Sequence, residues 1–280
     1  MKENKWKNLG LTVLVAVACL VVYFNLHLTD LLGIKASDNA KDLINEIAMF
    51  LLFYLGAVIL SRKDVIKFKK EGFGVGFLIY LLPMLNVIST IKKMAGDYAT
   101  YGTFMQISIG ELLSTIVLTL FIGLAEETLF RGIIQNSLHD FFGEKNVGSV
   151  RAAIIIQAFV FGGVHLINYF TGSSDLGSAI IQILSATGMG FLFGAMYYCS
   201  GKNLWVPVIF HAFGDFRGLV HSGSLLGKNL SDNLSSYSSA YTVPAGYESM
   251  PYVLIGLLSI AYLVVMLIAT RKKAIDKYLK

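Results

Sequence analysis

The chain has 280 residues, of which 55% are apolar and only 15% are charged, and its mean hydropathy is +0.64. Soluble domains carry about 25% charged residues. The apolar residues here gather in blocks of roughly 18 or more, long enough to cross the ~30 Å hydrocarbon core as helices, so the composition excludes a soluble protein. The net charge of +5 comes without a basic stripe or an RNA-binding motif, which excludes nucleic acid as a partner.

Eight such blocks follow one another along the chain. In hydrocarbon every backbone amide must be paired within its own segment, so the blocks are expected to be helices. The predicted fold is an all-α, polytopic membrane bundle of about eight transmembrane helices. The limits of the blocks are 9–28, 43–61, 73–91, 106–130, 152–170, 179–199, 204–221 and 251–270.

The distribution of Lys and Arg predicts the orientation. With an even number of spans both termini lie on one side, and 17 of the 23 Lys and Arg residues fall on that side. The positive-inside rule therefore predicts that both termini are cytoplasmic. The stretch Ala16–Cys19 resembles a lipoprotein processing site, but the apolar run continues through Phe24, which favours an uncleaved first span. The polar segment 222–250 is then an extracytoplasmic loop, and residues 1–280 form a single membrane domain.

Ionisable residues inside a membrane helix are costly and therefore indicate function. Some have simple explanations: Glu46 lies near the end of its span, and His139 follows the fourth span and is expected to be solvated. The others form three short clusters. These are Glu126, Glu127 and Arg131 in the fourth block, Phe161 and His165 in the fifth, and His211 and Asp215 in the seventh.

The spacing within these clusters is informative. Glu127 and Arg131 are four residues apart on one helix face, with the acid on the favourable N-terminal side, so they are expected to pair. Glu126 points about 100° away from that pair and stays available for chemistry. His211 and Asp215 are also four apart, so the acid can fix the imidazole tautomer, or both can face one ligand. Two other spans carry packing signals. In the sixth span, Gly190 and Gly194 predict a close helix contact, and Pro83 is expected to kink the third span.

These motifs resemble the CAAX-prenyl-protease and bacteriocin-processing (CPBP, also called Abi) intramembrane endopeptidases. The pattern of that family is Glu-Glu-x-x-x-Arg, then Phe-x-x-x-His, then His-x-x-x-Asn or Asp, on three separate helices. The matching positions are Glu126, Glu127 and Arg131, then Phe161 and His165, then His211 and Asp215. The resemblance covers a catalytic core at roughly 105–221. It departs from the eukaryotic prenyl-protein members at Asp215, where those members generally have Asn.

The resemblance implies hydrolysis of peptide bonds within the membrane, open to the cytoplasmic side. Glu126 and His165 would activate the attacking water, while His211 and Asp215 would polarise the carbonyl and stabilise the oxyanion. Glu127 and Arg131 would form a supporting bridge that orients Glu126. A carboxylate cannot donate a hydrogen bond, so Asp215 is expected to orient His211. The resemblance favours a glutamate mechanism without a cofactor, and zinc held by Glu126, His165 and His211 is the alternative.

Three functions remain in competition. An endopeptidase would act on membrane-associated peptides, such as lipidated protein C-termini, bacteriocins or signalling peptides. A non-catalytic scaffold or bacteriocin self-immunity protein would use the same fold to bind a partner. A transporter would carry repeats and discontinuous helices at the midplane, and neither is evident in the sequence. The intact motifs favour the endopeptidase, whose partners are the lipid bilayer and a peptide or lipidated protein substrate.

Overall fold

Only helices occur among the residues that the computed structural model describes, which are 4–25, 28–36, 38–101, 109–144, 146–222 and 249–272. This confirms the all-α prediction for that part of the chain. The predicted loop 222–250 falls almost wholly outside the described residues. In chain order the helices are α1 (Lys5–Asn25), α2 (Leu28–Leu31), α3 (Asp38–Ile59), η1 (Lys63–Ile66), α4 (Phe73–Met84), α5 (Asn86–Tyr101), α6 (Ile109–Glu127), η2 (Thr128–Gln135), α7 (Asn136–Phe142), α8 (Val147–Val164), α9 (Ile167–Phe170), α10 (Leu176–Cys199), α11 (Trp205–Ser222) and α13 (Met250–Ala269).

Within the described residues, six helical stretches are long and apolar enough to cross a membrane, and a seventh arises if α4 and α5 count as one span. The chain is therefore a multi-pass membrane protein. The sequence predicted eight spans. The difference is the block 204–221, which forms α11 but carries His211, Asp215 and Arg217 and is not among the apolar spans. The six stretches are Lys5–Asn25, Ala40–Ile59, Leu112–Phe142, Val147–Phe170, Leu176–Cys199 and Met250–Ala269.

The third predicted span is broken rather than continuous. Helix α4 contains Pro83 near its end, and α5 begins two residues after α4 ends, at an angle of 58° to it. Proline lacks the N–H that a helix needs and its ring clashes with the preceding turn. The expected kink at Pro83 is thus present as a full break between two helices.

The fourth predicted span extends further than the sequence indicated. It was expected to end at residue 130, but the helical stretch runs from Leu112 to Phe142 through α6, η2 and α7. Most polar residues after 130 are buried, including His139, which was expected to be solvated and is 1% exposed, whereas Asp140 is exposed. Some of their polar groups find partners inside the bundle: for example, the Gln135 amide donates a hydrogen bond to the Gly194 carbonyl, 3.0 Å away.

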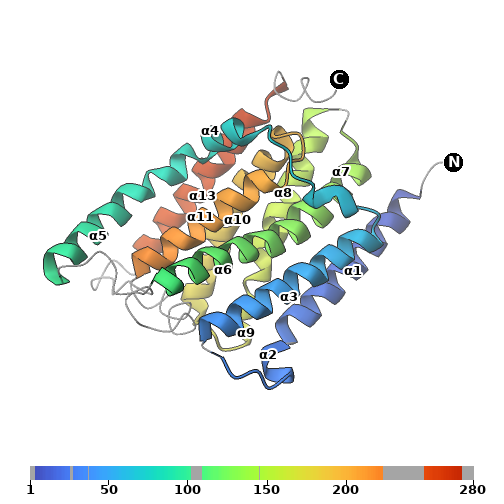
Figure 1. Cartoon of the computed structure of the whole chain (residues 1–280). Coiled ribbons are helices and arrows are strands. Elements are labelled where there is room, and N and C mark those ends of the chain that lie inside the picture. The colour runs from blue at the N-terminus through green and yellow to red at the C-terminus, as the bar shows by residue number, and fades with distance from the viewer. Residues whose placement is uncertain are drawn as a thin grey trace.

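The beginning of α1 and the end of α13 lie at the same end of the bundle (Figure 1). The Lys5 ammonium donates to the Phe141 carbonyl at 3.1 Å, and Arg151 donates to the Leu267 carbonyl at 2.6 Å. Arg62 pairs with Asp140 at this end, and Lys202 pairs with Glu144. We call this the basic end of the bundle.

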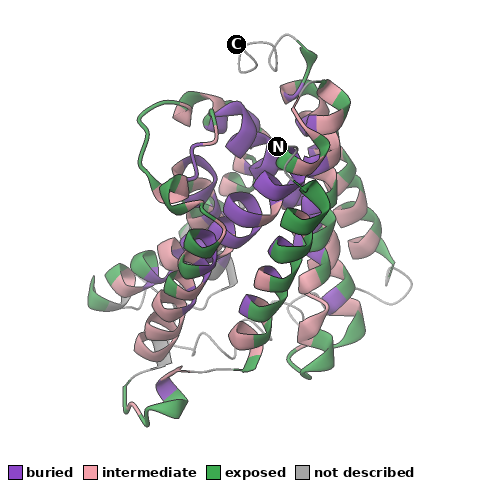
Figure 2. Ribbon diagram, turned by 90° about the vertical axis from the view of Figure 1, so that its right-hand side faces the viewer, coloured by how far each residue is buried: buried purple, intermediate pink, exposed green. Residues whose placement is uncertain are grey.

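Helix α10 lies at the centre. Of its most apolar stretch 61% is buried, against 17% in α1 and in α13. Buried residues gather toward the end of the bundle that carries the N and C labels (Figure 2). A side chain on Gly190 would place its Cβ 2.8 Å from the Ala158 Cα, and one on Gly162 would meet the Thr187 hydroxyl. Backbones of α8 and α10 therefore approach closely, which confirms the helix contact predicted at Gly190 and Gly194.

Replacing Gly190 with Leu is expected to lower the stability of the protein by about 1–3 kcal/mol, the usual effect of overpacking a tight contact. Gly256 on α13 provides the matched control, because no atom lies within 4 Å of the position a Cβ would take there. Thermal unfolding in detergent measures both variants. Equal midpoints for Gly190→Leu and Gly256→Leu would contradict the tight α8–α10 contact.

Candidate active site

Glu126 and Glu127 end helix α6, directly before the wide π-helical turn η2. Such turns occur mostly as short insertions within α-helices, frequently at functional sites. Seven of the eight η2 residues are buried. The turn therefore places the two adjacent glutamates at the point where the helix enters the buried part of the bundle.

Glu127 and Arg131 form the expected ion pair. The Arg131 Nη1 donates to the Glu127 Oε1 at 2.8 Å, and both side chains are fully buried. The guanidinium also lies against two aromatic rings, 4.6 Å from the Phe161 centroid and 5.3 Å from the Phe193 centroid. Cation–π contacts of this kind strengthen when they are shielded from water. Arg131 is thus fixed by one carboxylate and two rings from α8 and α10.

His211 on α11 lies among three carboxylates. Its Nδ1 is 2.8 Å from the Glu127 Oε1, while its Nε2 is 3.6 Å from the Glu126 Oε2 and 3.5 Å from the Asp215 Oδ2. The ring stacks on Phe193 with centroids 4.9 Å apart. Since an ionised carboxylate only accepts hydrogen bonds, Nδ1 is the donor to Glu127, and Nε2 faces the other two acids.

Glu127 has a second partner, in addition to Arg131, that the sequence did not predict. Sequence reasoning gave Asp215 the task of orienting His211 and gave the Glu127–Arg131 pair the task of orienting Glu126. In the structure the His211 Nδ1 donates its close hydrogen bond to the Glu127 Oε1, and the same oxygen accepts from Arg131. The imidazole is therefore tied to the buried ion pair, and Asp215 lies on its opposite, more open side.

Burial divides the site into a sealed part and an accessible part. The side chains of Glu127 and Arg131 are 0% exposed, whereas Glu126 is 23% and Asp215 is 35% exposed. His211, at 9%, lies between the two parts. A reacting group can therefore approach Glu126, Asp215 and the His211 Nε2, while the buried pair holds the imidazole from behind.

His165 lies at the end of α8, one helical turn beyond Phe161. Its Nδ1 is 2.9 Å from the Phe161 carbonyl oxygen, and the two rings meet edge to face at 5.3 Å. The Phe161 ring also contacts the His211 ring, with centroids 6.1 Å apart. Phe161 thus contacts both histidines and the Arg131 guanidinium, and it links the second motif to the first and third.

Two groups near the site were not identified from the sequence. Phe193 lies between the two glycines of the predicted helix contact, Gly190 and Gly194, and it packs on both Arg131 and His211. Glu46, interpreted as a helix-end acid, is half-buried, lies 3.5 Å from the Tyr23 hydroxyl and is within electrostatic reach of Glu126. Neither has a sequence signal, because each lies far along the chain from the residues that it meets.

The zinc alternative requires Glu126, His165 and His211 to gather around one ion. Over the parts of the chain that the structure describes, no group of three or more His, Cys, Asp or Glu side chains is placed to hold a metal ion. These three residues therefore do not fit a zinc site, and no step below runs through a metal.

An independent comparison with known families agrees with the motifs. Residues 108–217 match the family described as type II CAAX prenyl endopeptidase, Rce1-like. This range contains all seven residues of the three clusters. Comparison with curated proteins gave no match, and comparison with solved structures gave none. Residues 108–217 are therefore similar to the Rce1-like type II CAAX prenyl endopeptidases, a family of intramembrane proteases.

Proposed function

We propose that this protein is an intramembrane endopeptidase that hydrolyses peptide bonds of membrane-associated substrates. The observation that carries the proposal is the position of His211, held by the buried Glu127 on one side and facing the accessible Glu126 and Asp215 on the other. Amide hydrolysis needs a base for water and polar groups for the charge that develops on the carbonyl oxygen. We place the catalytic core at 105–221, which encloses the matched family range.

In this proposal the Glu126 carboxylate accepts a proton from a water molecule as the water oxygen attacks the peptide carbonyl. The same carboxyl group then gives the proton to the leaving amide nitrogen, so that a carboxylic acid and an amine are formed. His211 and Asp215 lie on the carbonyl side, and His165 helps to hold the water. Glu127 and Arg131 fix His211 rather than contact the substrate.

We infer that the basic end of the bundle faces the cytoplasm and that α11 crosses with the other helices, which makes eight crossings. The positive-inside rule supports this orientation. Arg62, Lys69, Arg151 and Lys202 lie at the end where α1 begins and α13 ends. Substrates would reach the site from that side, and lipidated protein C-termini, bacteriocins and signalling peptides are the candidate classes.

The test compares membrane peptides and lipoprotein termini, by mass spectrometry, between cells with the native protein and cells with Glu126→Ala. We expect at least one peptide to remain uncleaved only in the variant. Glu71→Ala is the matched control, because Glu71 is an exposed acid at the basic end. Identical peptide profiles in native and Glu126→Ala cells would favour the scaffold or self-immunity function, which uses the same fold without cleavage.

A further inference from the structure

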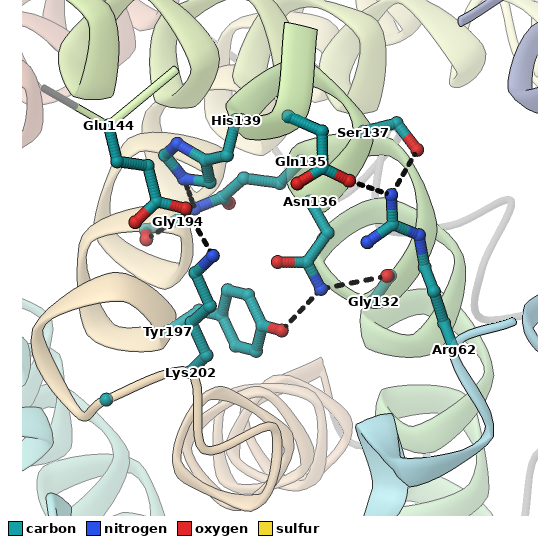
Figure 3. A network of polar contacts seen from close by, with 12 residues as sticks. Arg62, Gly132, Gln135, Asn136, Ser137, His139, Glu144, Gly194, Tyr197 and Lys202 are labelled. Carbon is teal, nitrogen blue, oxygen red and sulfur yellow. Dashed lines mark hydrogen bonds and ion pairs between the residues drawn. The ribbon is translucent and has the colours of Figure 1, made fainter. Parts of the chain in front are cut away.

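A second polar cluster surrounds a cavity of about 290 Å³ at the basic end of the bundle. Figure 3 shows the contacts around it, which come from α7, from the end of α10 and from the segment after α3. The cavity lies apart from the three catalytic motifs, since none of their residues lines it. Its polar lining consists of Ser61, Arg62, Asp64, Asn136, Tyr197 and Lys202.

Two cations are fixed in the lining by acids outside the cavity. Arg62 donates to Asp140 at 2.6 Å and to the Ser137 hydroxyl at 3.0 Å. Lys202 is held in the same way by Glu144. The Arg62 Nε is buried and has no hydrogen-bond partner among the described residues. Asp140 and Glu144 thus balance the two cations, and the lining adds one carboxylate, Asp64.

Tyr197 adds a neutral donor. Asn136 donates one amide hydrogen to the Tyr197 hydroxyl at 2.6 Å and the other to the Gly132 carbonyl at 3.0 Å. Because the hydroxyl accepts from Asn136, its own hydrogen remains for another acceptor. The tyrosine hydroxyl, the guanidinium and the ammonium together present donors to one small volume. That combination suits the oxygens of a phosphate.

Two residues that line the cavity have backbone conformations that are unfavourable for any residue other than glycine. Ser61 has a φ of 59° and Lys202 a φ of 58°, and they are the only non-glycine residues with positive φ among those described. Both follow the ends of helices, at α3 and α10, where glycine is the usual residue because it adopts this conformation without strain. Here the less favourable backbone carries side chains that line the cavity.

The position of the cavity indicates the source of the phosphate. Arg62 lies three residues after the span that ends at Ile59, and Lys202 lies three residues after the span that ends at Cys199. Both are therefore at the boundary of the hydrocarbon, where lipid phosphates lie, and basic pockets between membrane helices bind lipid headgroups. We propose that this cavity binds the phosphate of a phospholipid headgroup, with Arg62, Lys202 and Tyr197 as the donors.

The test measures binding of phosphatidylethanolamine to the delipidated protein in detergent, by native mass spectrometry and by the rise of the unfolding midpoint. Lys202→Gly removes the cation and also relieves the backbone at that position, so loss of folding does not mimic loss of binding. We expect the variant to bind the lipid about tenfold more weakly, as loss of one charged hydrogen bond implies.

Two further arms identify the ligand and the site. Lys70→Ala removes an exposed lysine at the same end of the bundle, outside the cavity, and should leave binding unchanged. Equal weakening by Lys70→Ala and Lys202→Gly would mean diffuse surface attraction and would overturn the proposal. So would native-like binding by Lys202→Gly, or inorganic phosphate that displaces the lipid and binds as tightly. Glu126→Ala should bind the lipid normally, so the lipid site can fail or stand independently of proteolysis.

Discussion

Replacing Glu126 with Gln is expected to lower the rate of peptide cleavage by about 10²–10⁴-fold, the contribution of a general base. Glutamine has nearly the same shape but cannot accept the proton of the attacking water. The Glu126 side chain is partly exposed, and its Oε2 lies 3.6 Å from the His211 Nε2, so little packing is lost. Turnover of a peptide found by the cellular comparison, measured on purified protein in liposomes, tests this expectation.

The control for that experiment is Glu71→Gln, which alters an exposed carboxylate at the basic end and should cleave at the native rate. Unfolding midpoints should coincide for the native protein and both variants. Native turnover by Glu126→Gln would remove the general base from the mechanism. A lowered unfolding midpoint for Glu126→Gln, in contrast, would show that Glu126 stabilises the fold.

Replacing Arg131 with Met is expected to destabilise the protein by roughly 3–5 kcal/mol, because it leaves the fully buried Glu127 carboxylate without its cation. The double variant Glu127→Gln with Arg131→Met removes both charges. Exchanging a whole buried pair for uncharged groups is often close to neutral for stability. The double variant should therefore unfold nearer to the native midpoint than Arg131→Met does.

Activity should behave differently from stability in this pair. The double variant still lacks the carboxylate that accepts from the His211 Nδ1 at 2.8 Å, so the imidazole loses its fixed orientation. We expect stable but nearly inactive protein, measured by unfolding in detergent and by turnover in liposomes. Recovery of both stability and native turnover in the double variant would show that Glu127 has no part in placing His211.

The helices could be predicted because hydrocarbon forces each apolar block to pair its own backbone. Each of the eight blocks is mostly helical where the structure describes it. The errors come from polar residues and from proline. The stretch after residue 130 is polar by composition, but Gln135 donates to Gly194 of α10 and the His139 ring packs on Tyr198 of the same helix. The break after Pro83 depends on how the next helix packs, which the residue alone does not state.

Within the candidate site, a pair of residues close in sequence could be predicted, whereas contacts between distant residues could not. The Glu127–Arg131 pair follows from two residues four apart on one helix, and the structure contains it. The bond between Glu127 and His211 joins residues 84 positions apart and depends on how α6 packs on α11. Phe193 and Glu46 enter the surroundings for the same reason. Motif order located the three clusters, but it did not reveal which side chain supports which.

The wide turn η2 makes this region sensitive to the length of the chain. A turn with i→i+5 bonding accommodates one residue more than an α-helical turn of the same rise. Without that room, one extra residue in a regular α-helix would rotate everything after it by about 100°. The wide turn absorbs the residue, so Asn136 and His139 keep their contacts with Tyr197 and Tyr198. A further insertion in Thr128–Gln135 has no such turn to absorb it and should be tolerated far less well than a conservative exchange in this segment.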